Sequence, residues 1–234
     1  GSQNVGLGNE TLGTNTTGAT NVAVGFAALN ANTTASANTA IGHRSLQANT
    51  TAANNTAIGF CSLSANTTAS ANTAVGTNAL KTTTTGAENT AVGVGVLDVN
   101  TGSYNTAMGV DAGGSNTSGT GNVFMGNASG GANTTANNNT AIGKDSLTTN
   151  TTGTFHASLG ACSLLSNTTG TENTGIGGQA LKCNTTGSQN TAVGYASLFT
   201  NTTGSSNVAV GCGALFANTT GFDNAAIGRN AMAA

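Results

Sequence analysis

One phrase, Asn-Thr-Thr-Gly followed by Asn-Thr-Ala-Val-Gly and Ala-Leu, returns every 17 residues along the whole chain. Its register can be followed through one glycine per repeat, called here the glycine column. The members of this column are Gly8, Gly25, Gly42, Gly59, Gly76, Gly93, Gly109, Gly126, Gly143, Gly160, Gly177, Gly194, Gly211 and Gly228. Such a period is typical of solenoids, in which each repeat packs against its neighbours. The sequence therefore predicts an all-β fold, a parallel β-solenoid (β-roll) of about fourteen 17-residue coils.

The repeats follow one another without insertions, so we expect a single repeat domain spanning residues 1–234. The coil that ends at Gly109 is one residue short, because Asn-Thr-Gly replaces the usual Asn-Thr-Thr-Gly. This one-residue deletion lies near 100–105. Because the next two coils also lose a core leucine, an irregular region is expected at about 100–131.

Large apolar residues recur in the residues just before each glycine. The residue directly before the glycine is always apolar, and two residues earlier Thr exchanges with Val, as at Val75 and Thr73. Alternate residues of a strand share a face, so both columns are predicted to face the core. The Ala between them, as at Ala74, is then expected on the opposite face, closely approached by another backbone across the coil or from another chain. Phe124 interrupts this Ala column and marks a local departure.

A leucine column, four residues after the glycine, is the second predicted core column. It is interrupted by Gly113, Gly130 and Met232. Its members are Leu12, Leu29, Leu46, Leu63, Leu80, Leu97, Leu147, Leu164, Leu181, Leu198 and Leu215. The interruptions at the two glycines follow the deletion directly, which is the second reason to expect irregularity there.

Two asparagine columns are as regular as the glycines. The first lies four residues before each glycine and is interrupted only by His156, and the second lies seven residues after each glycine and is interrupted only by Thr83. Stacked identical amides can bond from coil to coil, so structural ladders are predicted, with ligand binding by the amides as the alternative. The repeated Asn-Thr-Thr also satisfies the N-glycosylation pattern, which would apply in a eukaryotic secretory route.

The charge content is very low, at 5% of residues with a formal net charge of −2. This excludes an electrostatic footprint for nucleic acid, and the absence of a long apolar run argues against membrane insertion. All charged residues fall in variable columns, which are therefore expected on the surface together with several aromatic residues. Tyr195, Phe199 and Phe216 are expected to form a contact patch near the C-terminal end.

Catalytic and metal-binding patterns are missing from the sequence. His43 and His156 lie far apart with no carboxylate or nucleophile at a fixed spacing from either. The four cysteines, Cys61, Cys162, Cys183 and Cys212, lack metal-ligand spacing and are expected to be free thiols or contacts with another chain. We therefore predict no catalytic, cofactor-binding or metal-binding residues, no cofactor and no enzymatic activity.

The phrase Asn-(Thr/Val)-Ala-(Val/Ile)-Gly followed by Ala-Leu or Ser-Leu, as in residues 190–194 and 207–211, resembles the head repeats of trimeric autotransporter adhesins. The 17-residue unit is also similar to arrays in viral and bacterial tail-fibre proteins that carry a C-terminal self-cleaving chaperone domain. The resemblance covers the full chain. It implies a left-handed parallel β-roll with three chains side by side, forming a fibre on the outside of a cell or on a virion.

Association of chains is expected on energetic grounds as well, because two large side chains per coil form a thin core for so long a chain. The predicted function is a structural or adhesive extracellular fibre on a cell or virion surface. Its predicted partner is itself, as a homotrimer, a head-to-tail filament or both, with a host surface or glycan as a further partner. The alternative is an ice-binding solenoid, because one column is Thr in every coil; adjacent Thr residues of an extended segment would, however, point to opposite faces.

Overall fold

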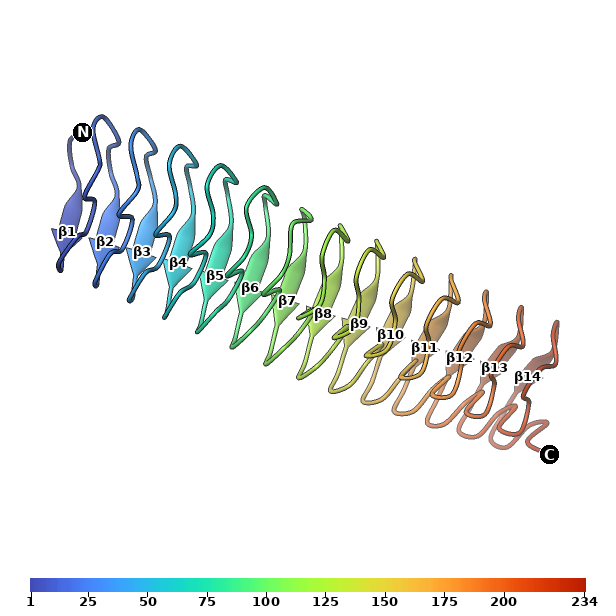
Figure 1. Cartoon of the computed structure of the whole chain (residues 1–234). Helices are drawn as coiled ribbons and strands as arrows, with labels where there is room; N and C mark the ends of the chain where they lie inside the picture. The colour runs from blue at the N-terminus through green and yellow to red at the C-terminus, as the bar shows by residue number, and fades with distance from the viewer. The chain divides into compact units, whose positions relative to one another are not determined.

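Each repeat forms one strand of three residues, which ends directly before the glycine of the glycine column (Figure 1). The computed structural model describes all residues, 1–234. It is all-β and contains fourteen strands, β1(Val5–Leu7), β2(Val22–Val24), β3(Thr39–Ile41), β4(Thr56–Ile58), β5(Thr73–Val75), β6(Thr90–Val92), β7(Thr106–Met108), β8(Val123–Met125), β9(Thr140–Ile142), β10(Ala157–Leu159), β11(Thr174–Ile176), β12(Thr191–Val193), β13(Val208–Val210) and β14(Ala225–Ile227). The predicted parallel β-solenoid is confirmed.

The chain divides into two compact units, residues 1–118 with β1 to β7 and residues 119–234 with β8 to β14. Within each unit, successive strands pair in parallel with equivalent residues opposite each other, as Thr56 opposite Thr73 in the first and Thr174 opposite Thr191 in the second. Bends and turns carry the chain from one strand to the next. Within a unit, each residue therefore lies beside the residue at the equivalent position of the next coil.

The predicted orientation of the strands is wrong. The middle residue of β2 to β14 is buried, and the two residues that flank it are half-buried or exposed. Ala74 is fully buried in β5, whereas Ile58 at the end of β4 is 37% exposed. The Ala column thus faces the interior, where the other side of the same coil approaches it closely, and the two larger columns face outward. The coil is too thin to hold a large strand residue and the leucine of the opposite side together.

The leucine column is core, as predicted. The leucines from Leu29 to Leu198 are fully inaccessible, and small residues beside them complete the apolar interior. Their backbone is unusual, because all of them have positive φ angles, such as 48° at Leu63. The left-handed conformation costs about 1–2 kcal/mol for a residue with a Cβ. Burial of the leucine side chain contributes about 2 kcal/mol and so offsets this cost.

Three further positions in every coil have positive φ: the glycine, the second residue after it, and the residue before the first Asn column. The second of these is left-handed even at Ala27 and Arg44. Each coil therefore has four residues with positive φ, and at each of them the backbone turns tightly around the core.

The region after the deletion keeps the same coil plan. Gly113 and Gly130 have φ angles of 60° and 59°, close to those of the leucines that they replace. Phe124 is fully buried, and a Cβ at Gly130 would lie 2.3 Å from its ring, so in this coil the aromatic ring occupies the space of the missing leucine. The departure at Phe124 is thus a compensated exchange of side chains.

The two asparagine columns form buried ladders. In the first, Asn38 Oδ1 accepts the backbone N–H of Asn55 in the next coil at 2.9 Å, and Asn38 Nδ2 donates to the Ala52 carbonyl. In the second, Asn49 Nδ2 donates to Asn32 Oδ1 at 3.1 Å and to the same Ala52 carbonyl at 3.0 Å. The amides therefore satisfy one another and the backbone inside the coil, which confirms the structural interpretation.

Thr83 interrupts the second ladder and leaves one buried hydrogen-bond acceptor without a donor. Its hydroxyl donates to the Asn100 carbonyl at 2.8 Å, and Asn66 Oδ1 in the preceding coil is buried without a hydrogen bond. In other coils that oxygen accepts an amide N–H, as Asn49 Oδ1 does from Asn66 Nδ2 at 2.9 Å.

We predict that Thr83→Asn raises the free energy of unfolding by about 1–2 kcal/mol, because it gives a buried acceptor its donor. Chemical denaturation of the variant and the parent measures the change. Thr85→Asn, at an exposed position two residues further on, is the control and should change stability by less than about 0.5 kcal/mol. A Thr83→Asn protein no more stable than its control would contradict the ladder argument.

Candidate functional site

Of the histidines and cysteines, His43 and Cys61 lie side by side in neighbouring coils, where the Cys61 backbone N–H donates to the His43 carbonyl at 3.0 Å. His43 is exposed and stacks between Phe26 and Phe60, with ring centroids 5.3 and 5.1 Å away. All four cysteines are free, three of them half-buried and Cys212 exposed. No group of three or more His, Cys, Asp or Glu side chains is arranged to hold a metal ion.

His156 takes the place of an asparagine inside the first ladder. Its backbone N–H donates to Asn139 Oδ1 at 3.0 Å, and its Nδ1 accepts the backbone N–H of Asn173 at 3.2 Å. In the neutral ring Nδ1 therefore carries no proton and Nε2 carries it. Asn167 Nδ2, 3.1 Å from Nε2, donates instead to Asn150 Oδ1 and to the Gly170 carbonyl. Burial lowers the pKa of His156 to about 4, and a hydrogen bond to the backbone at Gly170 partly opposes this shift by favouring the charged form.

This pKa predicts acid sensitivity in the second unit. The folded pKa of His156, about 4, lies below its unfolded value of 6.5, so the unfolded chain binds more protons between these values. Stability is therefore complete above pH 6.5 and falls by about 3 kcal/mol as the pH drops to about 4. Urea unfolding at pH 7.5 and pH 4 should show this loss in the parent and a smaller one in His156→Asn. Equal losses in the two proteins would show that His156 is not responsible.

The outward strand columns make a sheet face, which is defined by two sets of residues. The first set is Val5, Val22, Thr39, Thr56, Thr73, Thr90, Thr106, Val123, Thr140, Ala157, Thr174, Thr191, Val208 and Ala225. The second set is Leu7, Val24, Ile41, Ile58, Val75, Val92, Met108, Met125, Ile142, Leu159, Ile176, Val193, Val210 and Ile227. None of these side chains is buried and none is charged. Within each unit the sheet face is a regular strip of methyl groups and threonine hydroxyls.

A second regular surface is the threonine ridge, made by two adjacent columns at a bend of the coil. The inner column is Thr16, Thr33, Thr50, Thr67, Thr84, Thr101, Thr117, Thr134, Thr151, Thr168, Thr185, Thr202 and Thr219. The outer column is Thr17, Thr34, Thr51, Thr68, Thr85, Ser118, Thr135, Thr152, Thr169, Thr186, Thr203 and Thr220. Because the backbone bends here, both columns reach the surface, contrary to the expectation for an extended segment.

The two columns of the ridge differ in their hydrogen bonds. Inner hydroxyls donate to the carbonyl of the next coil, as Thr168 Oγ1 does to Thr185 at 3.1 Å and Thr185 Oγ1 to Thr202 at 3.0 Å. Outer hydroxyls, such as those of Thr169 and Thr186, are exposed and make no hydrogen bond within the chain. The ridge therefore combines fixed inner side chains with a file of free hydroxyls.

The asparagines of the repeated Asn-Thr-Thr are unsuitable for glycan attachment in the folded chain. Asn167 is fully buried, and its Nδ2 donates to Asn150 Oδ1 and to the Gly170 carbonyl. Transfer of a sugar to that nitrogen would break both bonds and open the coil. The glycosylation pattern is therefore a consequence of the ladder.

The charged side chains follow the sequence expectation, because none of them is buried. Asp98 is half-buried, and burial, which the Lys81 charge opposes, raises the pKa of its carboxyl. The one ion pair joins Lys144 Nζ to Asp145 Oδ2 at 3.7 Å. A pair this exposed contributes little to stability.

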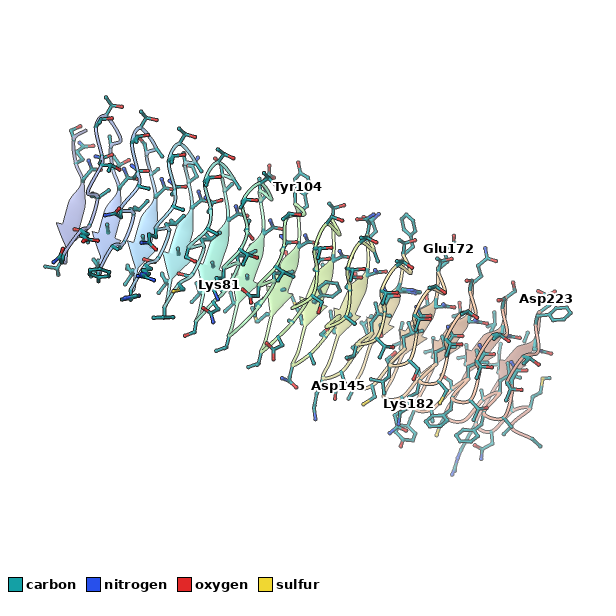
Figure 2. All side chains as sticks on the ribbon, in the orientation of Figure 1. Lys81, Tyr104, Asp145, Glu172, Lys182 and Asp223 are labelled. Carbon is teal, nitrogen blue, oxygen red and sulfur yellow. The ribbon has the colours of Figure 1, made fainter.

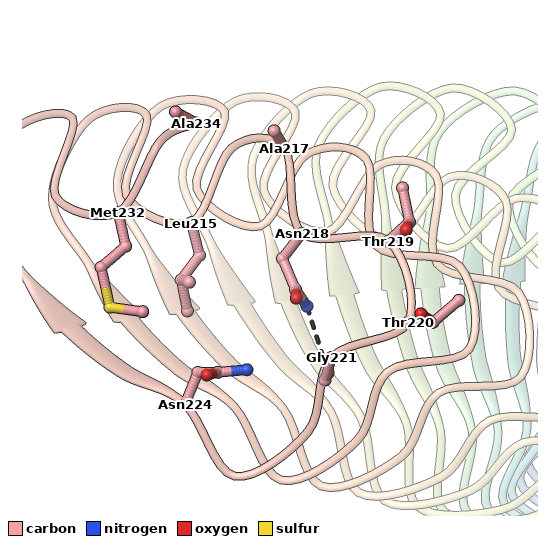
Figure 3. A pocket seen from close by; sticks show the side chains of 9 residues that line it. All are labelled: Leu215, Ala217, Asn218, Thr219, Thr220, Gly221, Asn224, Met232 and Ala234. Carbon is pink, nitrogen blue, oxygen red and sulfur yellow. Dashed lines mark hydrogen bonds between the residues drawn. The ribbon is translucent and has the colours of Figure 1, made fainter.

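A hollow of about 310 Å³ lies in the last coils (Figure 3). Leu215 and Asn218, from the leucine and second asparagine columns, line it together with Asn224 of the first asparagine column. Met232 takes the place of the leucine in the final coil, and Ala234 completes the wall. These are the inward columns of the solenoid, so the hollow is the interior of the last described coil and carries no separate chemistry.

No helix of the structure has the length and hydropathy to cross a membrane. Comparison with protein-family models, curated proteins and solved structures found no match to the chain. What the protein does must therefore be argued from its surfaces, of which the sheet face and the threonine ridge are the most regular.

Proposed function

We propose that the protein is a non-catalytic structural element of an extracellular fibre, on a cell or virion surface, and that copies of it associate side by side through the sheet face. One observation carries the proposal: each unit exposes a regular strip of aliphatic and threonine side chains without a single charge. Ile41, Ile142 and Ile176 are each 38–39% exposed in the isolated chain. Large uncharged apolar patches of this kind mark association surfaces.

A second copy of the same chain is the partner that fits this strip best. Its sheet face has the same spacing from coil to coil, so aliphatic side chains can interlock along the whole length of a unit. Threonine hydroxyls at the neighbouring column can bond to one another across the contact. Three copies around a common axis would bury the sheet face of every chain, which makes the trimer the expected assembly.

The oligomeric state tests this proposal. Sedimentation equilibrium of the parent should give a trimer, and the triple variant Ile58→Lys, Ile142→Lys and Ile176→Lys should give a monomer, because it places like charges on the contact. The matched control is Thr68→Lys, Thr152→Lys and Thr186→Lys, three outer positions of the threonine ridge. A parent that is monomeric at every concentration, or a sheet-face variant that stays trimeric, would overturn the proposal.

End-to-end stacking into a filament stays a prediction. Electron microscopy of the native material tests it, since particles of one fixed length at all concentrations contradict it. Display of the remaining surface to a host or glycan is the adhesive part of the proposed role.

Ice binding is the second candidate, and one observation favours it: both columns of the threonine ridge reach the surface in register. A rigid array of methyl and hydroxyl groups can order the water that it contacts. Thermal hysteresis of the purified protein distinguishes the candidates. Ice shaping that disappears in the ridge variant and persists in the sheet-face variant would replace the fibre proposal as the main function.

A further inference from the structure

The second unit carries a cluster of exposed aromatic and polar side chains at the turn that follows the strands. This cluster, called here the aromatic edge, consists of Gln179, Lys182, Tyr195, Phe199 and Phe216. They lie in the turn that follows the strand in three successive coils, and none of them belongs to the sheet face or to the threonine ridge. Lys182, Phe199 and Phe216 occupy the same position of that turn. Tyr195 is 58% and Phe216 39% exposed, so the edge presents large rings to solvent.

The rings of the aromatic edge are held in defined places. Phe199 and Phe216 stack with centroids 5.1 Å apart and planes 5° from parallel. Tyr195 lies against Gly178, where a Cβ would be 3.5 Å from the ring, and its hydroxyl is 3.5 Å from Gln179 Oε1. Rings fixed in this way lose little freedom when a ligand packs on them.

Lys182 supplies a positive charge without a carboxylate partner. Its Nζ lies 5.5 Å from the centroid of the Phe199 ring and forms no ion pair. A cation over an aromatic face keeps its attraction for an anion, and the contact holds the long side chain in place.

Charges in the second unit are divided between opposite edges of the coils. Lys144, Asp145, Lys182 and Arg229 lie at the turn after the strand, a formal sum of 3 − 1 = +2. The acidic side chains of Glu172 and Asp223 lie before the strand, and Figure 2 shows them at the edge away from Lys182. An anionic partner is therefore attracted to the turn edge, although the whole chain has a formal charge of −2.

We propose that the aromatic edge binds an anionic polysaccharide. The apolar C–H face of a sugar ring packs on an exposed ring such as Tyr195, Gln179 bonds to sugar hydroxyls, and Lys182 pairs with a carboxylate or sulfate group of the polymer. A small free anion would use the lysine alone, and a neutral glycan would leave the lysine unpaired. The combination of exposed rings, an amide and an unpaired cation fits both parts of an acidic sugar.

The proposal extends the adhesive part of the proposed function by naming a partner. It does not depend on trimer formation, because the aromatic edge is complete within one chain. The oligomeric state, measured on the same samples, distinguishes failure of this proposal from failure of the proposed function. A trimer that does not bind the polysaccharide would contradict only the binding proposal, and a monomer that binds it would contradict only the proposed association.

Surface plasmon resonance on carboxymethyl-dextran and on unmodified dextran provides the test, since the two polymers share a backbone and differ in charge. The full chain should bind carboxymethyl-dextran, with affinity that falls as salt rises, and should bind dextran at least tenfold more weakly. Lys182→Gln should lower the affinity for the charged polymer about tenfold, and Tyr195→Ala should lower it to a similar extent.

Lys81→Gln is the matched control, because Lys81 occupies the equivalent turn position in the first unit but does not lie over an aromatic ring. Its binding should equal that of the parent. Equal binding of the parent and Lys182→Gln, or equal binding to the two polymers, would overturn the proposal. Binding to phosphatidylglycerol vesicles but to neither polymer would also overturn it and assign the edge to a membrane surface.

Discussion

Replacing Gly143 with alanine is expected to lower the free energy of unfolding by about 4 kcal/mol or more. Its φ angle is 129°, which residues with a Cβ rarely adopt. The added Cβ would also lie 2.7 Å from the carbonyl carbon and oxygen of Gly160 in the next coil. Since these are backbone atoms in a paired sheet, the clash can be relieved only by separating two coils. Urea unfolding followed by circular dichroism measures the loss.

Gly228→Ala separates the effect of backbone strain from the effect of the clash with the next coil. Gly228 has a similar φ of 124°, but the nearest atom to an added Cβ is 4.0 Å away, on Ala231. It therefore has the backbone strain without the clash and should cost only about 1–3 kcal/mol. If both variants lost the same stability, contact between neighbouring glycines would not be the reason for the glycine column.

Asn190→Leu is expected to cost about 3–5 kcal/mol, the second large effect. Asn190 is fully buried; its Oδ1 accepts the Asn207 backbone N–H at 3.0 Å, and its Nδ2 donates to the Gly204 carbonyl at 2.8 Å. Leucine fills a similar volume but leaves the buried N–H of Asn207 without an acceptor. Thermal and urea unfolding should show the loss at every pH.

Asn190→His is the informative control, because His156 shows how imidazole fits the same column. At pH 7.5 its ring nitrogens can replace the amide oxygen and nitrogen, so it should lose less stability than Asn190→Leu. Below pH 6.5 its stability should fall with pH, as expected for His156. If the histidine variant lost as much stability as the leucine variant at neutral pH, the shape of the amide would contribute more to stability than its hydrogen bonds.

The parts of the fold that follow from repetition could be predicted from the sequence. The glycine period indicates stacked coils. The two asparagine columns, each interrupted once, indicate ladders, because the short amide side chain has an acceptor oxygen and a separate donor nitrogen. The leucine column was also assigned correctly to the core. In each case the constancy of the column reflects a contact with its own copy in the next coil.

The orientation of the strands could not be derived from hydrophobicity. A strand such as Thr73–Val75 has two large residues around one Ala74, and the usual rule places the large ones inside. Here the interior is filled from the other side of the coil by Leu80 and by asparagine amides, which leaves room only for alanine on the strand. The thickness of the coil decides which strand residues face the interior, and the sequence does not show that thickness.

The left-handed turns also escaped prediction, although a signal was present. Leucine at positive φ is rare, so the leucine column gave no reason to expect it. Gly113 and Gly130 in that column were interpreted as interruptions, whereas they are the residues that adopt this backbone most readily. Asn78 and Asn138, in two other variable columns, are of the type that tolerates positive φ, and both adopt it.

The candidate surfaces were only partly foreseen. Tyr195, Phe199 and Phe216 were expected to form a patch, and Phe199 does stack on Phe216. The contact of Lys182 with that stack depends on a turn whose course the sequence does not reveal. The sheet face was missed altogether, because its residues had been assigned to the interior.

The strict register of the coils has a genetic consequence. Equivalent residues of successive coils contact each other at a separation of 17 positions, as Asn21 does Asn38. Recombination between two copies of the repeat in the gene would therefore add or remove a whole number of 17-codon blocks, and every remaining coil would find the neighbour that it needs. The length of such a chain can therefore change in one event without passing through a variant that does not fold. Selection can then change the length of the solenoid without changing the residues on its surface.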